Sequence, residues 1–405
     1  MMPLSLTSCA TTSELFGRAV NAAEYYGFQP MDNVVKGGGT RTKIERIDPR
    51  ALSYVRRDER SLIPLVNACA LRGLCSTAKP TFFWKPGPAV TTGPNRHVSI
   101  ELHALGVASA VAEAILINVA QAIAEDAGIE RRVVRLNSIG AHDSSARYIR
   151  ELSSYLRKNS DTIAESILAR VATDPLGALL TLVEKQNPVV GRAPQSMEFL
   201  NEEERRHLAH VLEFLEASDT YYELNPFVLG SRDCWTHTLF EVHGIHHETE
   251  ELVPFAKGGR YDRLATSAMQ SGTGAGVGMT LTFELKGANV PNMDRIKRDT
   301  TPATLYFAHL GDVAKRQSLG VMENLRRAHI PVYQSLAYEH IAEQMAEAQG
   351  YDVPYVIIMG FKEANEGTII VRDTRTNSQA TVPKGELVSY LRRRRVAAEP
   401  ALLPR

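Results

Sequence analysis

The C-terminal quarter of the chain carries the pattern that most constrains its fold. After a polar, turn-rich stretch, short apolar segments alternate with segments of helical periodicity. Alternating strands and helices of this kind build a small α/β domain around a largely parallel sheet. Strands are predicted at residues 304–310, 331–336 and 355–359, a hairpin at 368–382, and helices at 312–328, 339–349 and 384–395.

A second segment, from about residue 143 to residue 217, is almost wholly helical and interrupts a region of mixed strands and helices. Asp143, Ser144 and Thr173 are N-cap candidates, because short oxygen-bearing side chains bond the free N–H groups of a first helical turn. Strands are predicted around this segment at residues 81–84, 132–136, 227–242 and 276–285. We therefore divide the chain into a core in two parts (1–139 and 223–286), a helical insertion (140–222), a linker (287–302) and a C-terminal domain (303–397).

Composition excludes several classes of protein. The chain has 405 residues, which corresponds to two or three domains at roughly 150 residues each. Its 46 basic and 46 acidic residues cancel, so any contact with nucleic acid must come from local patches. No apolar run approaches the roughly 18 residues of a membrane span, so we expect no membrane association. The four cysteines, none in a CxxC pair, predict a reduced, cytoplasmic chain without a metal site.

Several short motifs resemble, in order and spacing, those of the histidyl-tRNA synthetase family. They are RDERS at 57–61 for the family's LRPEGT loop, LNSIG at 136–140, TLFE at 238–241 for TVFE, KGGRYDRL at 257–264, the glycine-rich strand GVGM at 276–279, and GFKE at 360–363. The resemblance implies an α+β class II synthetase core, that is, an antiparallel sheet with helices, interrupted by a helical insertion. It also implies a C-terminal α/β domain similar to the family's anticodon-binding domain.

The resemblance assigns an amino-acid pocket to residues that this chain retains. Glu59 and Ser61 would hold the amino group of histidine, and Asp233 is the retained aspartate of the family's RGLDYY segment. The loop that lines the pocket in the family comprises Gly258, Gly259, Arg260, Tyr261 and Asp262. Two interpretations stay open: the loop receives histidine or a similar small amine, or its glycines serve only to fold it.

The first of the three arginines with which the family clamps ATP is missing from its loop. A guanidinium suits this task because it is always charged and binds two phosphate oxygens at once. The arginine and glutamate positions fall on Val90, Thr91 and Thr92. Arg96 follows at the expected tip of the loop, where we predict a solvated side chain.

The second and third arginines are also replaced. Gly230 stands at the second position, and Arg232, two residues on, would share its face if this segment were a strand. Leu285 stands at the third, with Lys286 beside it. One such arginine is worth orders of magnitude in rate, so we expect a non-ligating paralogue that acts as an RNA-binding or regulatory protein and needs no cofactor. The alternative is an active histidine–tRNA ligase that uses ATP and Mg²⁺ with Arg232, Arg96 and Lys286 as displaced clamps.

The resemblance also suggests partners. The first is tRNA, and the candidate RNA contacts are four consecutive arginines, Arg392, Arg393, Arg394 and Arg395. Such a run attracts phosphate, although basic charge at a helix C-terminus also stabilises the helix dipole. The preceding helix would add Lys315, Arg316, Arg326 and Arg327 to this basic surface. A homodimer and a heteromer with a genuine synthetase are both open as assemblies.

Overall fold

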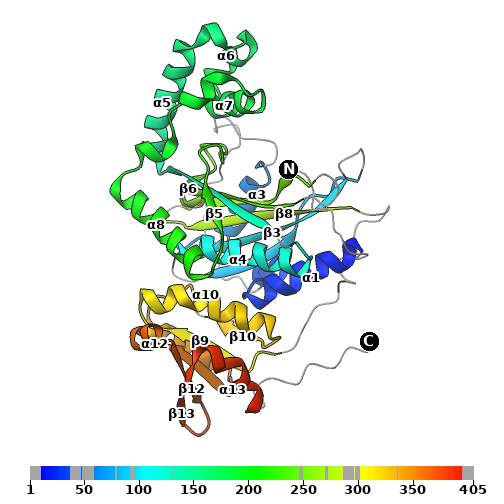
Figure 1. Ribbon diagram of the computed structural model, residues 1–405, viewed down its shortest axis with the longest axis vertical. Coiled ribbons are helices and arrows are strands. Elements are labelled where there is room, and N and C mark those ends of the chain that lie inside the picture. The colour runs from blue at the N-terminus through cyan, green and yellow to red at the C-terminus, as the bar shows by residue number, and fades with distance from the viewer. Residues whose placement is uncertain are drawn as a thin grey trace.

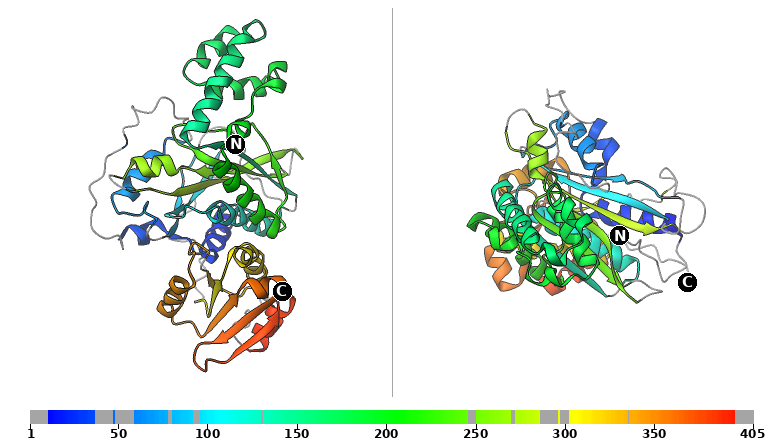
Figure 2. Two further views of the ribbon diagram at one scale, coloured as in Figure 1. Left: turned by 90° about the vertical axis from the view of Figure 1, so that its left-hand side faces the viewer. Right: turned by 90° about the horizontal axis from the view of Figure 1, so that it is seen from above.

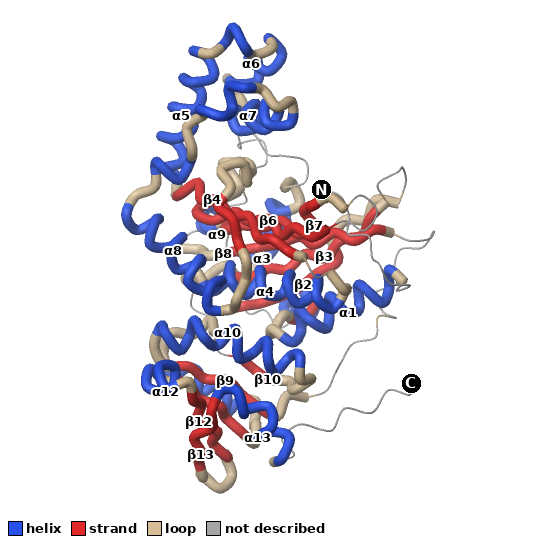
Figure 3. Tube along the Cα trace, viewed as in Figure 1, coloured by secondary structure: helices blue, strands red, loops and turns tan. Residues whose placement is uncertain are grey.

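Two sheets and a projecting helical arm make up the computed structural model (Figure 1). The structure describes residues 11–36, 47, 59–77, 80–91, 96–129, 131–245, 250–269, 272–285, 296, 302–334 and 336–394. The arm rises from one side of the larger sheet, and the domain with the smaller sheet lies on the opposite side, as the left view in Figure 2 and the trace in Figure 3 also show. No helix within these ranges combines the length and the apolar character that crossing a membrane requires.

The larger sheet is antiparallel except at its edges. Its order is β1-β2-β3-β8-β7-β6-β4-β5, and only the β1–β2 and β4–β5 pairs are parallel. The strands are β1 (Gln29–Pro30), β2 (Thr81–Pro86), β3 (His97–Leu105), β4 (Arg132–Gly140), β5 (Tyr222–Leu224), β6 (Thr236–Ile245), β7 (Leu252–Arg260) and β8 (Gly276–Glu284). This sheet, with its helices, confirms the predicted class II core.

Helices cover both faces of the larger sheet. They are α1 (Thr12–Tyr25), α2 (Met31–Lys36), α3 (Leu62–Ala70), α4 (Val111–Asp126) and α9 (Asp262–Ser267). Helix α4 is apolar nearly all round and packs with α1 on the face that carries Trp84, Leu102 and Ala104. Helices α3 and α9 pack on the other face, with Phe83 and Leu105. Successive strand residues point to opposite faces, so the odd-numbered side chains of β2 and β3 lie on the α3 side.

The segment predicted as a helical insertion forms the projecting arm with α5 (His142–Lys158), α6 (Glu165–Val171) and α7 (Pro175–Glu184), whose apolar side chains cluster together with Ile139, Val228 and Leu239 of the core. Its last helix, α8 (Glu202–Ala217), packs instead in the core cluster through Val211, Phe214 and Leu215. The segment also has 3₁₀ turns at Ser160–Thr162, Pro188–Arg192 and Ser196–Phe199. The capping prediction was displaced by one residue, because Asp174 rather than Thr173 caps α7 by accepting the Gly177 N–H at 2.9 Å. Asp143 and Ser144 lie inside the first turn of α5.

The C-terminal domain follows the predicted alternation. Its elements are β9 (Leu305–His309), α10 (Asp312–Arg327), β10 (Val332–Gln334), α11 (Ile341–Gly350), β11 (Tyr355–Met359), α12 (Phe361–Glu366), β12 (Thr368–Asp373), β13 (Gln379–Pro383) and α13 (Leu387–Arg393). The sheet order is β10-β9-β11-β12-β13, parallel up to β11 and antiparallel beyond it. The sheet is therefore mixed rather than largely parallel. Most of the predicted linker lies outside the described residues.

Helix α10 joins the C-terminal domain to the core through ion pairs, a contact surface that we call the α10 seam. Arg326 reaches Asp126 at the end of α4 at 2.9 Å, and Arg327 reaches Glu125 at 2.8 Å. Arg316 pairs with Glu213 of α8 at 3.1 Å. Lys315 pairs with Glu339 within the domain at 2.7 Å. The four basic residues that we expected to extend an RNA surface therefore serve internal contacts, and that expectation was wrong.

Candidate functional site

The residues that the resemblance assigns to an amino-acid pocket meet on the α3 side of the larger sheet. Glu59 lies just before α3 and is 9% exposed. Its two carboxylate oxygens accept the backbone N–H of Ser231 at 3.2 and 3.1 Å, and one of them accepts the indole N–H of Trp235 at 2.8 Å. Ser61, the residue before α3, is exposed. The carboxylate predicted to hold an amino group is thus already bonded to donors from this chain.

Gly258 and Gly259 lie inside β7, where neighbouring atoms leave no room for a side chain. A Cβ added at Gly258 would lie 2.4 Å from the backbone oxygen of Gly278 and 2.6 Å from the ring of Phe240. At Gly259 it would lie 2.9 Å from the backbone oxygen of Thr238. The close approach that these glycines permit is to protein atoms, which favours the interpretation that they fold the loop.

Arg260 and Asp262 belong to a buried cluster of ion pairs rather than to an open pocket. The Arg260 guanidinium is fully buried, and its Nε lies 2.8 Å from Oε1 of Glu113 on α4. It also donates to the carbonyls of Val107 and Ser109 at 3.0 Å each. Asp262 completes the cluster, since it pairs with Arg260 at 3.2 Å and accepts a backbone N–H at 2.9 Å. A charge so fully paired holds two layers of the core together.

Tyr261 opens a line of buried polar groups along the α3 face. Its hydroxyl lies 3.0 Å from Nδ1 of His103, and Nε2 of His103 lies 3.6 Å from Glu101. Glu101 pairs with Lys85 at 2.6 Å. Burial alone would raise the pKa of Glu101, but the nearby His103 ring and the ion pair with Lys85 lower it. The sequence analysis missed Lys85 and Glu101, because it ended the strand at Trp84 whereas β2 runs to Pro86.

Neither Val90 nor Thr91, the described arginine and glutamate positions of the first loop, supplies a cation. Val90 pairs with His97 through two backbone hydrogen bonds of 2.8 and 2.9 Å, and Thr91 is exposed. Thr92 lies outside the described residues. Arg96 directly precedes β3 and is half-buried, with its carbonyl accepting the N–H of Leu285 at 3.0 Å. The prediction of a solvated Arg96 at the loop tip was therefore wrong.

The second arginine position is closed by packing. A Cβ at Gly230 would lie 2.4 Å from the Trp235 ring and 2.8 Å from Glu59. Residues 231–235 form a turn, and β6 begins only at Thr236, so the strand predicted from residue 227 was wrong in its first part. Without a strand, Arg232 has no face in common with Gly230.

Two arginines flank the retained aspartate instead. Arg232 lies 3.5 Å and Arg263 4.0 Å from the buried carboxylate of Asp233. Leu285, at the third arginine position, is buried. Lys286 lies outside the described residues. Among the described residues, none of the three positions at which the family has an ATP-clamping arginine carries a guanidinium.

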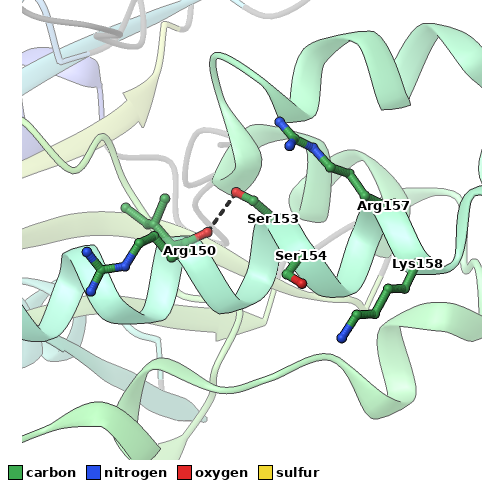
Figure 4. Close-up of a pocket in the computed structure, with 6 residues that line it drawn as sticks. Arg150, Ser153, Ser154, Arg157 and Lys158 are labelled. Carbon is green, nitrogen blue, oxygen red and sulfur yellow. Dashed lines mark hydrogen bonds between the residues drawn. The ribbon is translucent and has the colours of Figure 1, made fainter.

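A different set of cations lines a hollow of about 500 Å³ on α5 of the arm (Figure 4). Its lining residues are Ile149, Arg150, Ser153, Ser154, Arg157 and Lys158, with no carboxylate among them. The side chains of Arg150, Arg157 and Lys158 are exposed and make no hydrogen bond or ion pair with the described residues. This surface was not predicted, although the spacing of basic residues along α5 is a signal of it in the sequence.

Comparisons with known proteins give similarity both to the C-terminal domain and to nearly the whole chain. Residues 307–394 match the family described as "Anticodon binding domain". The histidine–tRNA ligase of Symbiobacterium thermophilum is 27% identical over 392 residues, which cover 94% of this chain and 87% of that protein. The histidine–tRNA ligase of Bacillus licheniformis is 23% identical over 379 residues, which cover 90% and 89%. Along nearly its whole length this chain is therefore similar to histidine–tRNA ligases.

A solved structure of the histidyl-tRNA synthetase of S. aureus without ligand is 18% identical to this chain. It covers 93% of this chain and 94% of that one, with a TM-score of 0.47. Within the described ranges, no three His, Cys, Asp or Glu side chains are arranged to hold a metal ion.

Proposed function

We propose that this member of the histidyl-tRNA synthetase family does not ligate histidine and acts as an RNA-binding or regulatory protein. One observation carries the proposal: Glu59, the carboxylate assigned to the amino group of histidine, accepts the Trp235 indole N–H at 2.8 Å. An incoming ammonium group would have to displace this charge-assisted hydrogen bond, which is among the stronger ones in proteins.

The electrostatics of the same face support the proposal. Adenylate formation brings a triphosphate beside a carboxylate, and fixed cations must offset the repulsion. Lys85 is a cation of this face, but Glu101 neutralises it at 2.6 Å. Arg232 and Arg263 face the carboxylate of Asp233. The alternative, a ligase that uses ATP and Mg²⁺, would require these groups to leave their partners when ATP binds.

The test is histidine-dependent ATP–pyrophosphate exchange, measured on the full chain. We expect the rate with histidine to equal the rate without it, since the loss of even one phosphate-clamping arginine removes about 10³-fold or more in rate. The histidine–tRNA ligase of Symbiobacterium thermophilum serves as the active control. Exchange within about a hundredfold of that control would contradict the proposal. If exchange is seen, its loss in Arg232→Gln would establish the displaced-clamp alternative.

The RNA role rests on the C-terminal domain, which matches the anticodon-binding family. Helix α13 ends in three exposed arginines, Arg392, Arg393 and Arg394, and Arg395 lies outside the described residues. Arg392 donates to the carbonyl of Ala328 at 3.2 Å, and Arg394 lies over the Tyr390 ring at 5.6 Å. Neither contact neutralises a charge, so these guanidinium groups keep their attraction for phosphate.

We expect replacement of Arg392, Arg393 and Arg394 by Gln to weaken tRNA binding and to flatten its salt dependence. Each lost phosphate contact lowers the slope of log affinity against log salt by about 0.7 for single strands and by about 0.9 for a B-form duplex, so a loss of this order is expected for each arginine that contacts phosphate. Filter binding at several salt concentrations measures this slope. The matched control is the triple Gln variant of Arg150, Arg157 and Lys158, which removes the same charge from α5. Equal slopes for wild type and the α13 variant would contradict the assignment of that run as an RNA contact.

A further inference from the structure

The arm leaves the larger sheet at an irregular rung of the β4–β6 ladder. Gly140, the last residue of β4, pairs there with His237 of β6, and the register of the two strands shifts between Ser138 and Gly140. Both partners have a left-handed backbone, with φ of 67° at Gly140 and 52° at His237. A histidine in this conformation inside a strand is strained, and strained positions cluster at functional and switching sites. We call residues 140–145, which lead from this rung into α5, the arm root.

One buried carboxylate holds the arm root in place. Glu204, in the first turn of α8, accepts the backbone N–H of Ala141 and the hydroxyl of Ser144, both at 2.7 Å. It also accepts the N–H of Asn201 at 2.8 Å. A Cβ added at Gly140 would lie 2.9 Å from Oε2 of Glu204, so the backbone of the arm root passes directly beside this carboxylate. Glu204 therefore joins the start of α5 to the start of α8.

The ring of His237 packs against a second histidine of α8. Its centroid lies 5.2 Å from that of the His207 ring, with 40° between the two planes. Nε2 of His207 lies 2.8 Å from Oε1 of Glu113. Nδ1 of His237, in contrast, is buried without a hydrogen-bond partner among the described residues. A neutral ring tolerates this position because one of its nitrogens carries no hydrogen, whereas a charged ring would need an acceptor for a buried N–H.

The surroundings of His237 favour its neutral form. The charged groups that face it come from four elements: His207 and Glu204 of α8, Glu113 of α4, Arg260 of β7 and Asp262 of α9. Burial lowers the pKa of His237, and the charge of His207 lowers it further, whereas the carboxylate of Asp262 raises it. Arg260 lowers this pKa and Glu113 raises it, and these two side chains are paired with each other. Within the described residues, Glu204 is the one carboxylate of the group whose donors are all uncharged.

We propose that His237 is a proton-sensitive switch for the arm root. In its neutral form the ring stays on His207, and Glu204 keeps its bonds to the arm root. When the ring takes up a proton, His207 repels it and it donates to Glu204, because a charged donor binds a carboxylate more strongly than neutral donors do. Ala141 and Ser144 then lose their acceptor, and the arm pivots at Gly140. The inference goes beyond the proposed function and does not depend on it.

The sign of the pH dependence follows from the surroundings of the ring. A histidine whose folded-state pKa is lowered stabilises the closed root above its unfolded value of about 6.5 and loses that contribution as the pH falls. At about pH 5.5, one unit below that value, uptake of one proton favours the open root by about tenfold.

Hydrogen exchange of the full chain at about pH 7.5 and about pH 5.5, corrected for the intrinsic effect of pH on exchange, tests the switch. We expect the protection of residues 141–145 to fall about tenfold at the lower pH, while α6 and α7 keep theirs. His237→Asn tolerates a positive φ and gains no charge, so its protection should not change with pH. His210→Asn, at an exposed position of α8, is the matched control and should respond as wild type does. Constant protection in wild type, an equal fall in His237→Asn, or a fall that extends through α6 and α7 would refute the switch.

Glu204→Gln tests the second half of the switch, the exchange of donors. A neutral glutamine cannot attract a charged imidazole, so the protection of the arm root should no longer depend on pH. Glu203→Gln, at the exposed neighbouring position, should keep the wild-type fall. A fall in Glu204→Gln equal to that of wild type would contradict the proposal.

His207→Gln decides the matter should His237→Asn not fold. Glutamine can still donate to Glu113, but it does not repel a charged His237. The midpoint of the loss of protection should therefore move to higher pH than in wild type. An unchanged midpoint would overturn the proposal.

Discussion

Glu113→Ala is expected to destabilise the fold by about 3–5 kcal/mol, because it leaves a buried guanidinium without its main partner. Glu113 and Arg260 are both fully buried, and they join α4 to the end of β7. Oε1 of Glu113 also lies 2.8 Å from Nε2 of His207 on α8. The Glu113 carboxylate therefore links α4, β7 and α8. Its loss is expected to weaken the packing of all three elements.

The same carboxylate predicts a pH dependence. Burial alone would raise the pKa of Glu113, but the charges of Arg260 and His207 hold that pKa well below its usual range. A carboxyl with a lowered folded-state pKa stabilises the fold above its unfolded pKa of about 4.3 and loses that contribution as pH falls. The stability difference between wild type and Glu113→Ala is therefore expected to narrow below about pH 4.3.

Urea unfolding at neutral and at acidic pH measures both effects. Glu125→Ala is the matched control, since it lies on the same helix and removes only partly exposed pairs, with Arg327 at 2.8 Å and with Arg132 at 3.7 Å. Exposed pairs are worth about 0–1 kcal/mol, so the control is expected to unfold nearly as wild type does. If the two variants lost similar amounts of unfolding free energy, the buried Glu113 pair would be no more stabilising than a partly exposed one.

Gly258→Ala is expected to cost about 1–3 kcal/mol through overpacking. The added methyl would meet the backbone oxygen of Gly278, which cannot turn away as a flexible side chain could. Strands β7 and β8 pair directly here, so the collision falls within the sheet ladder. The melting temperature should fall in the absence of any ligand.

Gly191→Ala is the control for the Gly258 variant, because a Cβ at Gly191 meets nothing within 4 Å. Its effect is expected to stay within about 0.5 kcal/mol. The pair also separates the two interpretations of the glycine loop. If Gly258 were kept for a ligand rather than for packing, Gly258→Ala would melt as wild type does and differ only in ligand binding.

Sequence reasoning succeeded where structure follows from local periodicity. Helix α10 and strand β11 occupy nearly the predicted residues, since each buries one face or one short apolar run. The end of β2 was misjudged because the proline-containing run after Trp84 was taken as a breaker. Lys85 nevertheless continues the ladder opposite Glu101, and Pro86 ends the strand.

The candidate site was harder to predict because its decisive contacts are distant in sequence. The Trp235–Glu59 hydrogen bond spans 176 positions. The glycine that replaces the second arginine was recognised as a lost charge. That it also makes room for an indole follows only from the packing around it. Likewise, the basic residues of α10 give no local sign of their acidic partners on α4 and α8.

The α10 seam has a mechanical consequence. Its ion pairs are joined by Tyr26, whose hydroxyl donates to Glu323 at 2.7 Å, so the two units are fastened by charged and neutral groups alike. They should tumble as one rigid body in solution, so any ligand that touches both units would have to fit a fixed distance between them. High ionic strength weakens ion pairs. It is therefore expected to lower the affinity for RNA and to weaken the contact between the two units at the same time.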